Sequence, residues 1–199
     1  YMTFHSVVPA PHTMIRGVRK MTPGTTLTIT PEGEIRSDTY WALDFTPSDE
    51  EAYYDRVDWA ELLLVHLRQA VKRRLTADVP VGVLLSGGLD SSLITGLLAE
   101  LGQRDLNTFS IGFKDVNGED GNEFVYSDLI ASHFGTTHHK IEARDDLVLS
   151  SMDHCIQAMS EPMVSHDCIG FYLLSDAVSK HVKVVQSGQG ADEVFGGYH

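Results

Sequence analysis

Two segments rich in glycine and serine carry residues whose chemistry suits phosphate binding. The first, Ser86-Gly87-Gly88-Leu89-Asp90-Ser91-Ser92, follows a short apolar run and precedes a helical pattern. Paired glycines let the backbone turn sharply and approach a ligand closely. A helix that begins there presents unpaired N–H groups and the positive end of its dipole, and the hydroxyls of Ser86, Ser91 and Ser92 add donors. The pattern predicts an anion site at a strand-to-helix turn.

The first segment also has a plainer interpretation, in which it is only a turn and Ser91 caps the helix that follows. A Walker-type loop is excluded, because it requires Gly-Lys-Ser or Gly-Lys-Thr and the segment contains no lysine. A phosphate site formed by these residues would therefore differ from that of a kinase or a GTPase.

The second segment, Ser187-Gly188-Gln189-Gly190-Ala191-Asp192-Glu193, follows another apolar run. Its glycines again allow close backbone approach, and we expect it at the same edge of a parallel sheet as the first segment. Asp192 would then face Asp90 across a crevice. Two carboxylates beside a pyrophosphate suit Mg²⁺, which binds few carboxylates together with phosphate oxygens. The alternative interpretation is an acidic surface turn.

The elements that must position these segments alternate between strands and helices. Apolar or β-branched runs predict four strands, at residues 81–85, 108–113, 138–141 and 182–186. Helical periodicity predicts helices at residues 91–101, 123–134, 147–159 and 170–180. This alternation predicts a doubly wound α/β fold with a parallel sheet, whose ligands bind beyond the carboxyl ends of its strands. His138 and His139 are neighbours in a strand, so they should point to opposite faces in packing or surface roles.

The N-terminal part of the chain has a different character. Residues 1–45 are interpreted as turns and β-hairpins, with Thr25–Thr30 and Ile35–Trp41 as strands. Residues 46–78 predict a linker and one long amphipathic helix, broken at most once, that starts near Ser48. The chain opens without an initiator methionine and ends without a stop pattern, so we expect a piece of a longer protein.

Composition favours a globular protein of the cytoplasm, with 42% hydrophobic and 22% charged residues. A net charge of −13 opposes binding to nucleic acid, whereas backbone N–H groups and Mg²⁺ can still hold ATP in a local pocket. No apolar stretch is long enough to cross a membrane, so no membrane partner is expected. Cys155 and Cys168 lack metal-type spacing, and we expect both to be buried thiols.

Both segments resemble known motifs. Ser86–Ser92, preceded by Val79-Pro80-Val81-Gly82-Val83-Leu84-Leu85, resembles the pyrophosphate-binding loop of ATP pyrophosphatases. Ser187–Glu193, continued by Val194-Phe195-Gly196-Gly197-Tyr198, is similar to the second ATP-site motif of asparagine synthetases. The resemblance implies a fold of the adenine-nucleotide α-hydrolase type. It also implies that residues 79–199 are an ATP-pyrophosphatase synthetase domain truncated at its C-terminus, and that residues 1–45 are the tail of a glutaminase domain.

The resemblance further implies cofactors and site residues. ATP is expected to contact Leu85, Ser86, Gly87, Gly88, Asp90, Ser91, Ser92, Ile111, Ser187 and Gly188, with Leu85 and Ile111 near the base. Mg²⁺ is expected on Asp90 and Asp192. The implied enzyme is a carbon–nitrogen ligase that activates a carboxylate as an acyl-adenylate for attack by glutamine-derived ammonia, giving asparagine from aspartate. Besides these small-molecule substrates, the expected partner is a second copy of the full-length protein, which would form a homodimer.

Departures from the family pattern leave alternatives open. Gln189 stands at the family's usual Glu position, where a carboxylate is thought to manage a proton, and an amide cannot act as a general base. Ser165 and Asp167 stand where the family usually has Asp and Ser. These changes resemble the N-acetylglutaminylglutamine amidotransferase branch, which amidates a dipeptide derivative. The alternatives are this acceptor or a non-catalytic nucleotide-binding relative; tRNA modification is disfavoured by the acidity of the chain.

Overall fold

A computed structural model describes residues 8–46, 48–49, 51–113, 124–161, 165 and 167–197. The chain divides into two compact units. The smaller unit contains residues 1–55 together with residues 159–165, and the larger unit contains residues 56–158 and 166–199. Both glycine-rich segments belong to the larger unit.

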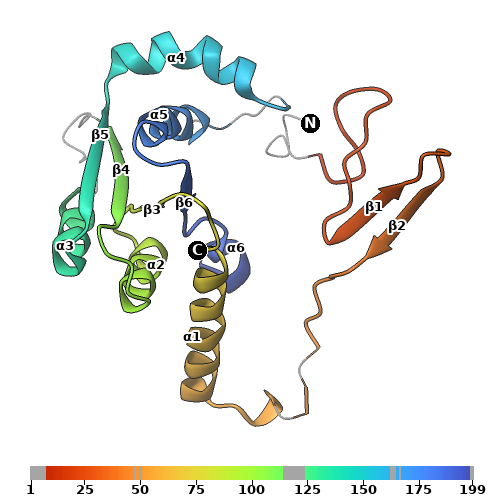
Figure 1. The fold of residues 1–199 in the computed structure, drawn as a ribbon, viewed down its shortest axis with the longest axis horizontal. Helices are drawn as coiled ribbons and strands as arrows, with labels where there is room; N and C mark the ends of the chain where they lie inside the picture. The colour runs from red at the N-terminus through yellow and green to blue at the C-terminus, as the bar shows by residue number, and fades with distance from the viewer. Residues whose placement is uncertain are drawn as a thin grey trace. The chain divides into compact units, whose positions relative to one another are not determined.

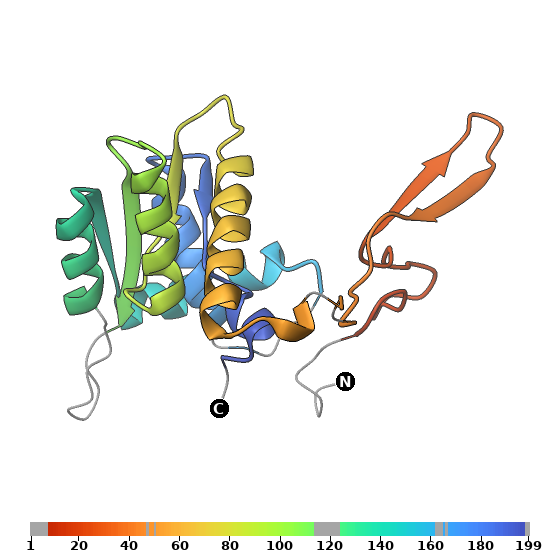
Figure 2. The same cartoon turned by 90° about the horizontal axis from the view of Figure 1, so that it is seen from below.

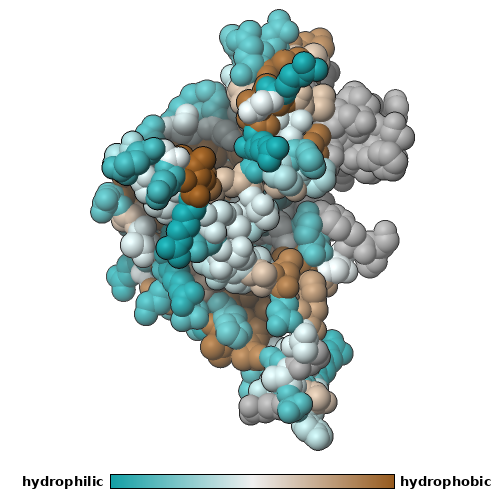
Figure 3. Space-filling view, turned by 90° about the vertical axis from the view of Figure 1, so that its right-hand side faces the viewer, coloured by the Kyte–Doolittle hydropathy of each residue, from teal (hydrophilic) through white to brown (hydrophobic). Residues whose placement is uncertain are grey.

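The smaller unit contains the predicted hairpin. Strands β1 (Thr25–Ile29) and β2 (Ile35–Thr39) pair antiparallel, with Thr25 opposite Thr39 and Ile29 opposite Ile35. Two strands alone cannot enclose a core. Leu27, Ile29 and Ile35 are accordingly 44%, 62% and 69% exposed within the described residues. Other apolar residues, coloured brown, reach the molecular surface in the view of Figure 3.

The predicted long helix is broken once, as expected. A 3-10 turn, η2, spans Glu51–Tyr53, and helix α1 spans Arg56–Arg73. The turn begins with reciprocal capping bonds: the Ser48 N–H donates to Glu51 Oε2 at 2.7 Å, and the Glu51 N–H donates to Ser48 Oγ at 3.2 Å. The bond from the Ser48 backbone lowers the pKa of Glu51 from its ordinary value.

The larger unit is built on a four-stranded parallel sheet. Its strands are β3 (Val81–Leu84), β4 (Asn107–Phe113), β5 (Thr137–Ala143) and β6 (Val184–Gln186), in the order β5-β4-β3-β6. From β3 the chain adds β4 and β5 on one side and β6 on the other. The order therefore reverses beside β3, and such a switch point is where ligands bind in open α/β sheets.

Helices lie on both faces of this sheet (Figures 1 and 2). Helices α1, α2 (Leu89–Glu100) and α3 (Phe124–Phe134) lie on one face. Helix α5 (Asp167–Ser179) lies on the other, and α4 (Asp145–Ala158) packs against α5. This arrangement confirms the predicted doubly wound α/β fold. Helix α5 begins earlier than predicted, β6 is shorter than predicted, and the short helix α6 (Ala191–Phe195) was not predicted.

Each face of the sheet has its own hydrophobic core. Val83 points into the core shared with α1 and α2, which also contains Leu98. Its neighbour Leu84 points the opposite way and packs against the core formed by β4 and α5 around Phe109. Cys155 is buried as expected, whereas Cys168 is only partly buried, which corrects the expectation of two buried thiols. No helix within the described residues has the length and apolar character needed to span a membrane.

The core on the α2 face predicts that two Leu→Ala substitutions differ greatly in their effect on the free energy of unfolding. Leu98 is fully buried, whereas Leu129 on α3 is 66% exposed. Leu98→Ala should lower the free energy of unfolding by about 2–5 kcal/mol, because it leaves a cavity. Leu129→Ala should change it by less than about 0.5 kcal/mol. Urea denaturation of both variants measures the difference, and equal losses would contradict this assignment of the core.

Candidate functional site

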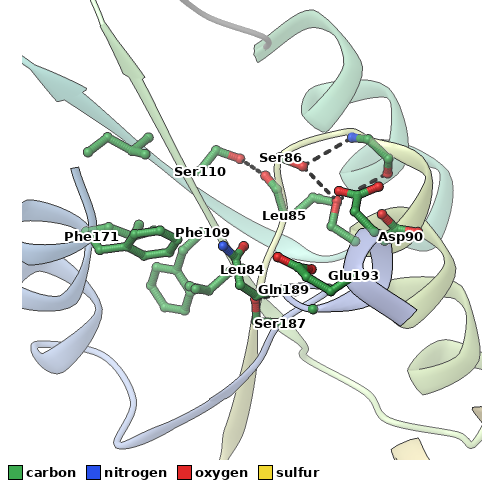
Figure 4. A pocket seen from close by; sticks show the side chains of 17 residues that line it. Leu84, Leu85, Ser86, Asp90, Phe109, Ser110, Phe171, Ser187, Gln189 and Glu193 are labelled. Carbon is green, nitrogen blue, oxygen red and sulfur yellow. Dashed lines mark hydrogen bonds between the residues drawn. The ribbon is translucent and has the colours of Figure 1, made fainter. Parts of the chain in front are cut away.

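A pocket lies at the carboxyl ends of β3 and β6, where the two glycine-rich segments meet (Figure 4). Most of the predicted site residues line it: Leu85, Ser86, Gly88, Asp90, Ser91, Ile111, Ser187, Gly188, Gln189 and Asp192. Gly87 and Ser92 do not line it. The structure therefore brings both segments to one site, and it gives Gly87 and Ser92 supporting positions.

Hydroxyl groups hold the first segment in shape. Ser86 Oγ accepts a hydrogen bond from the Gly88 N–H at 3.2 Å and lies 3.0 Å from Ser91 Oγ. The hydroxyls of Ser91 and Ser92 donate to the Gly88 carbonyl, at 3.2 and 2.7 Å. These bonds within the loop are drawn as dashed lines in Figure 4, except that of Ser92. The serine hydroxyls thus shape the turn as well as lining the pocket.

The start of α2 is open to an anion. Its N-cap residue is Gly88, and no side chain caps it. The expectation that Ser91 caps this helix is therefore wrong. The first N–H groups of an α-helix have no partner within the helix and carry the positive end of its dipole. The Gly88 N–H already donates to Ser86 Oγ, but Asp90 and Ser91 line the pocket, so the N–H groups of the first helical turn are available to a phosphate or carboxylate there.

Gly87 is needed because another helix packs on it. Its φ is +91°, and a Cβ built on it would lie 2.6 Å from both the Ser127 nitrogen and Tyr126 Cβ. Both contacts belong to the first turns of α3. A side chain at this position would therefore collide with a helix backbone. Gly87 sets how closely α3 approaches the loop.

Gly188 brings the second segment against the first. A Cβ built on it would lie 2.9 Å from Asp90 Cβ and 3.0 Å from the Ser91 nitrogen. Beyond it, the Gln189 N–H donates to Ser187 Oγ at 3.1 Å. Gly190, with a φ of +94°, then starts α6. The backbone from Gly188 to Gly190 therefore places Gln189 at the pocket, together with Asp192 on α6.

Acidic side chains lie at the end of the pocket nearest these loops. Within the described residues, the carboxylates of Asp90 and Asp192 have no hydrogen bond or ion pair, and no group of three or more His, Cys, Asp or Glu side chains is arranged to hold a metal ion. Mg²⁺ needs no such group, because it binds one or two carboxylates together with phosphate oxygens and water. The two aspartates therefore fit Mg²⁺ that arrives with a polyphosphate.

Apart from Ser110, the rest of the pocket is apolar. Sequence analysis identified Leu85 and Ile111 but missed Phe109 on β4, and Phe171 and Leu174 on α5. Phe171 and Leu174 are three residues apart on a helix and so lie on one face, which was the available signal. A pocket with loop N–H groups at one end and flat apolar side chains at the other suits a ligand with a phosphate end and a ring.

The segment around Ser165 and Asp167, where the sequence departs from the family pattern, lies partly outside the described residues. Glu161 is described, and it belongs to the smaller unit. Its carboxylate accepts a hydrogen bond from the Met14 N–H at 3.2 Å and forms an ion pair with Lys20. The hydrogen bond from Lys20 lowers the pKa of Glu161 from its ordinary value. Glu161 thus ties this segment to the N-terminal part of the chain.

Comparison with known proteins identifies relatives of the whole chain. The family model for asparagine synthase matches residues 62–199. Asparagine synthetase [glutamine-hydrolyzing] 1 of Bacillus subtilis is 32% identical over 100% of this chain and 30% of its own length. A putative asparagine synthetase [glutamine-hydrolyzing] 2 of Methanocaldococcus jannaschii is 34% identical over 96% of this chain and 36% of its own length. The chain thus spans about a third of the length of these relatives.

Among solved structures, an NH3-dependent NAD synthetase from Campylobacter jejuni is similar to this chain. The TM-score is 0.44 at 18% sequence identity. The match covers 73% of this chain and 62% of the synthetase.

The packing around Gly87 generates a prediction with a matched control. Gly102 also has a positive φ, +79°, but a Cβ there would meet nothing within 4 Å. Gly102→Ala should therefore cost only the backbone strain, about 1–2 kcal/mol. Gly87→Ala carries the same strain plus the collision with α3, so it should lower the free energy of unfolding by clearly more. Urea denaturation compares the two variants; equal losses would show that α3 does not press on Gly87.

Proposed function

Since this chain belongs to the asparagine synthase family, we propose that it forms the ATP site of an amide ligase that converts aspartate to asparagine. The observation that carries the proposal is the pocket at the switch point of the sheet, where an uncapped helix start, two aspartates and an apolar wall meet. A carboxylate is activated there as an acyl-adenylate, and ammonia derived from glutamine attacks it.

The two ends of the pocket support a division of roles in ATP binding. The phosphates lie against the loop formed by Ser86, Gly87, Gly88, Asp90, Ser91 and Ser92, with Ser187 and Gly188 on the opposite side. Leu85 and Ile111 lie near the base, and the apolar pocket wall adds Phe109 and Phe171 to them. Asp90 and Asp192 would hold Mg²⁺, which when bound would neutralise charge on the leaving pyrophosphate.

The chemistry follows in two steps. An oxygen of the acceptor carboxylate attacks the α-phosphorus of ATP, and the bond to the bridging oxygen breaks to release pyrophosphate. Ammonia then attacks the acyl carbon, loses a proton, and AMP leaves with the electron pair of the broken bond. The N–H groups at the start of α2 point at charge that develops on phosphate oxygens, which lowers the barrier without reorganisation.

The remaining parts of the proposal concern the whole protein. Residues 1–45 are the tail of a glutaminase domain, residues 46–78 a linker and helix, and residues 79–199 the synthetase domain. The protein works in the cytoplasm as a homodimer. Exposed apolar side chains on the β1–β2 hairpin support the first assignment, because a domain that supplies further strands would cover them.

Gln189 favours two alternatives. Its amide lines the pocket where the family usually has a carboxylate. An amide cannot accept the proton that ammonia loses, so another group must take it with either acceptor. The change to an amide resembles the branch whose acceptor is the dipeptide derivative N-acetylglutaminylglutamine. A non-catalytic nucleotide-binding relative would also tolerate Gln189.

The experiment that tests the function uses the full-length protein with ATP, Mg²⁺ and glutamine. With aspartate, we expect AMP and pyrophosphate in equal amounts with asparagine. The same products with N-acetylglutaminylglutamine alone would move the assignment to the dipeptide. Nucleotide binding without turnover on either acceptor would favour the non-catalytic alternative, and release of ADP and phosphate would contradict the adenylate route.

The metal assignment predicts the effect of removing one carboxylate. Asp90→Asn and Asp192→Asn should each lower the rate of pyrophosphate release by at least about 10²-fold, because loss of a metal ligand removes several kcal/mol of charge neutralisation. Asp176→Asn is the control, since Asp176 on α5 is exposed and, among the described residues, forms an ion pair with Lys180 at 2.8 Å, away from the pocket. Near-normal rates in both site variants would remove Mg²⁺ from these residues.

Gln189 predicts opposite outcomes for the two acceptors. If the acceptor is aspartate, Gln189→Glu supplies a general base and should raise asparagine formation by about 10²- to 10⁴-fold. If it is a dipeptide, the new charge leaves a hydrogen-bond partner unpaired and should cost about 1–3 kcal/mol. Pyrophosphate release is measured with both acceptors. A variant that matches the wild type on both would show that Gln189 does not contact the reacting groups.

A further inference from the structure

Buried polar side chains connect β4, β5 and α3 next to the loop Ser86–Ser92, here called the phosphate loop. His138 on β5 is at their centre, and its side chain is only 9% exposed. Its Nε2 lies 3.3 Å from Ser110 Oγ on β4 and 3.2 Å from Ser127 Oγ on α3, and its Nδ1 lies 2.9 Å from Thr108 Oγ1. Within the described residues, no buried side-chain nitrogen or oxygen lacks a partner. The network is fully satisfied, which is the condition for buried polar groups to hold one geometry.

The hydroxyl partners determine which nitrogen of His138 carries the proton. The Ser110 hydroxyl donates to the Leu85 carbonyl, and the Ser127 hydroxyl donates to the Phe124 carbonyl at 3.2 Å. Each hydroxyl has a single proton. Both serine oxygens can therefore only accept a hydrogen bond from His138, so Nε2 must be an N–H shared between them.

The other side of the ring fits the same tautomer. With the proton on Nε2, the Nδ1 of a neutral imidazole is an acceptor, and the Thr108 hydroxyl donates to it. Thr136 Oγ1, 2.8 Å from Thr108 Oγ1, then donates to Thr108. The hydrogen bonds run in one direction, from Thr136 through Thr108, His138 and Ser110 to the Leu85 carbonyl.

One branch of this network ends at the residue before the phosphate loop, and the other ends on α3, which packs against that loop. Leu85 directly precedes Ser86, and its N–H donates to the Phe109 carbonyl at 2.8 Å, so its position fixes where the loop leaves the sheet. Ser127 lies in the first turn of α3, and its own backbone nitrogen packs against Gly87. His138 therefore reaches the loop from the strand side through Ser110 and from the helix side through Ser127.

We propose that His138, as a neutral imidazole protonated at Nε2, is a positioning residue that sets the geometry of the phosphate loop for ATP. This inference rests on the function proposed above, because it takes the loop to bind the phosphates of ATP. His138 lines no part of the pocket, and it acts through Ser110 and Ser127.

The charges around His138 favour the neutral form. Asp128 Oδ1 on α3 lies 3.9 Å from Nε2, but Lys140 on β5 holds the other oxygen of Asp128 at 2.9 Å. Burial lowers the pKa of His138 from its ordinary value of 6.5, the Asp128 charge opposes that shift, and Lys140 and His139 add to it. Since the folded protein prefers the neutral ring, this contribution to stability is present above pH 6.5 and is lost as the pH falls towards the lowered pKa.

The tautomer is tested directly by nitrogen-15 NMR of the histidine rings in the full-length protein at pH 7, with His138→Gln to assign the signals. We expect one proton on the Nε2 of His138 and none on its Nδ1. A ring protonated at Nδ1, or on both nitrogens, would overturn the proposal. This measurement needs no turnover.

Substitutions test the positioning role. Gln can place an amide N–H near the position of Nε2, whereas the shorter Asn places its amide near Nδ1 and cannot reach the serines. His138→Gln should therefore keep the KM for ATP close to wild type, and His138→Asn should raise it about tenfold, with a smaller change in kcat. Ser127→Ala, which cuts the branch through α3 and changes no pocket-lining residue, should also raise the KM and serves if His138→Asn fails to fold.

The matched control is His133→Gln. His133 lies on α3, which also carries Ser127, but its side chain is exposed and its ring contacts Phe134, with the ring centroids 4.7 Å apart. Neither residue lines the pocket, so loss of that contact should affect stability alone and leave the KM for ATP unchanged. If His138→Asn and Ser127→Ala lose only stability and keep the KM for ATP, His138 has no positioning role. A wild-type protein that binds no ATP would refute the proposed function instead, while the NMR result would still report the tautomer.

Discussion

The contact between Gly188 and the first turn of α2 is the constraint on which the site depends. A Cβ at Gly188 would lie within 3.0 Å of Asp90 Cβ and the Ser91 nitrogen, so only a residue without a side chain lets the two loops meet. Parallel pairing of β3 with β6 brings the loops to the same edge of the sheet. The strand pairing places the two loops side by side, and Gly188 lets their backbones come into contact. Asp90 and Asp192 share a pocket because of both.

Much of the larger unit could be predicted because local signals agreed with the fold. The apolar run before Ser86 became β3, and Gly102 ends α2 in a positive-φ conformation, with the Gln103 N–H bonded to the Leu98 carbonyl at 3.1 Å. Helix α6 was missed because it has only five residues, too few to show a helical pattern, and because its N-cap is Gly190. Periodicity needs several turns to show.

Site residues that lie within one sequence motif could be predicted. Site residues that several separate elements bring together could not. Ser86, Asp90 and Gln189 were found because each lies within a recognisable motif. Phe171 reaches the pocket from α5, which no motif marks. His138 and His139 were correctly placed on opposite faces, but the roles of Ser110 and Ser127 depend on three elements meeting. Contacts of that kind are set by tertiary packing, to which a single sequence gives no local signal.

The strand order also determines when the site can exist during folding. Val81 of β3 pairs with Val184 of β6, so the chain between them, with β4 and β5, must be closed into a long loop before the two glycine-rich segments meet. Contacts between residues so distant in sequence form late, because the entropy of loop closure opposes them until most of the structure is in place. A chain still emerging from the ribosome would therefore hold β3, α2 and β4 without Ser187, Gly188 and Asp192, which complete the pocket. The topology thus keeps the pocket unfinished until β6 joins the sheet.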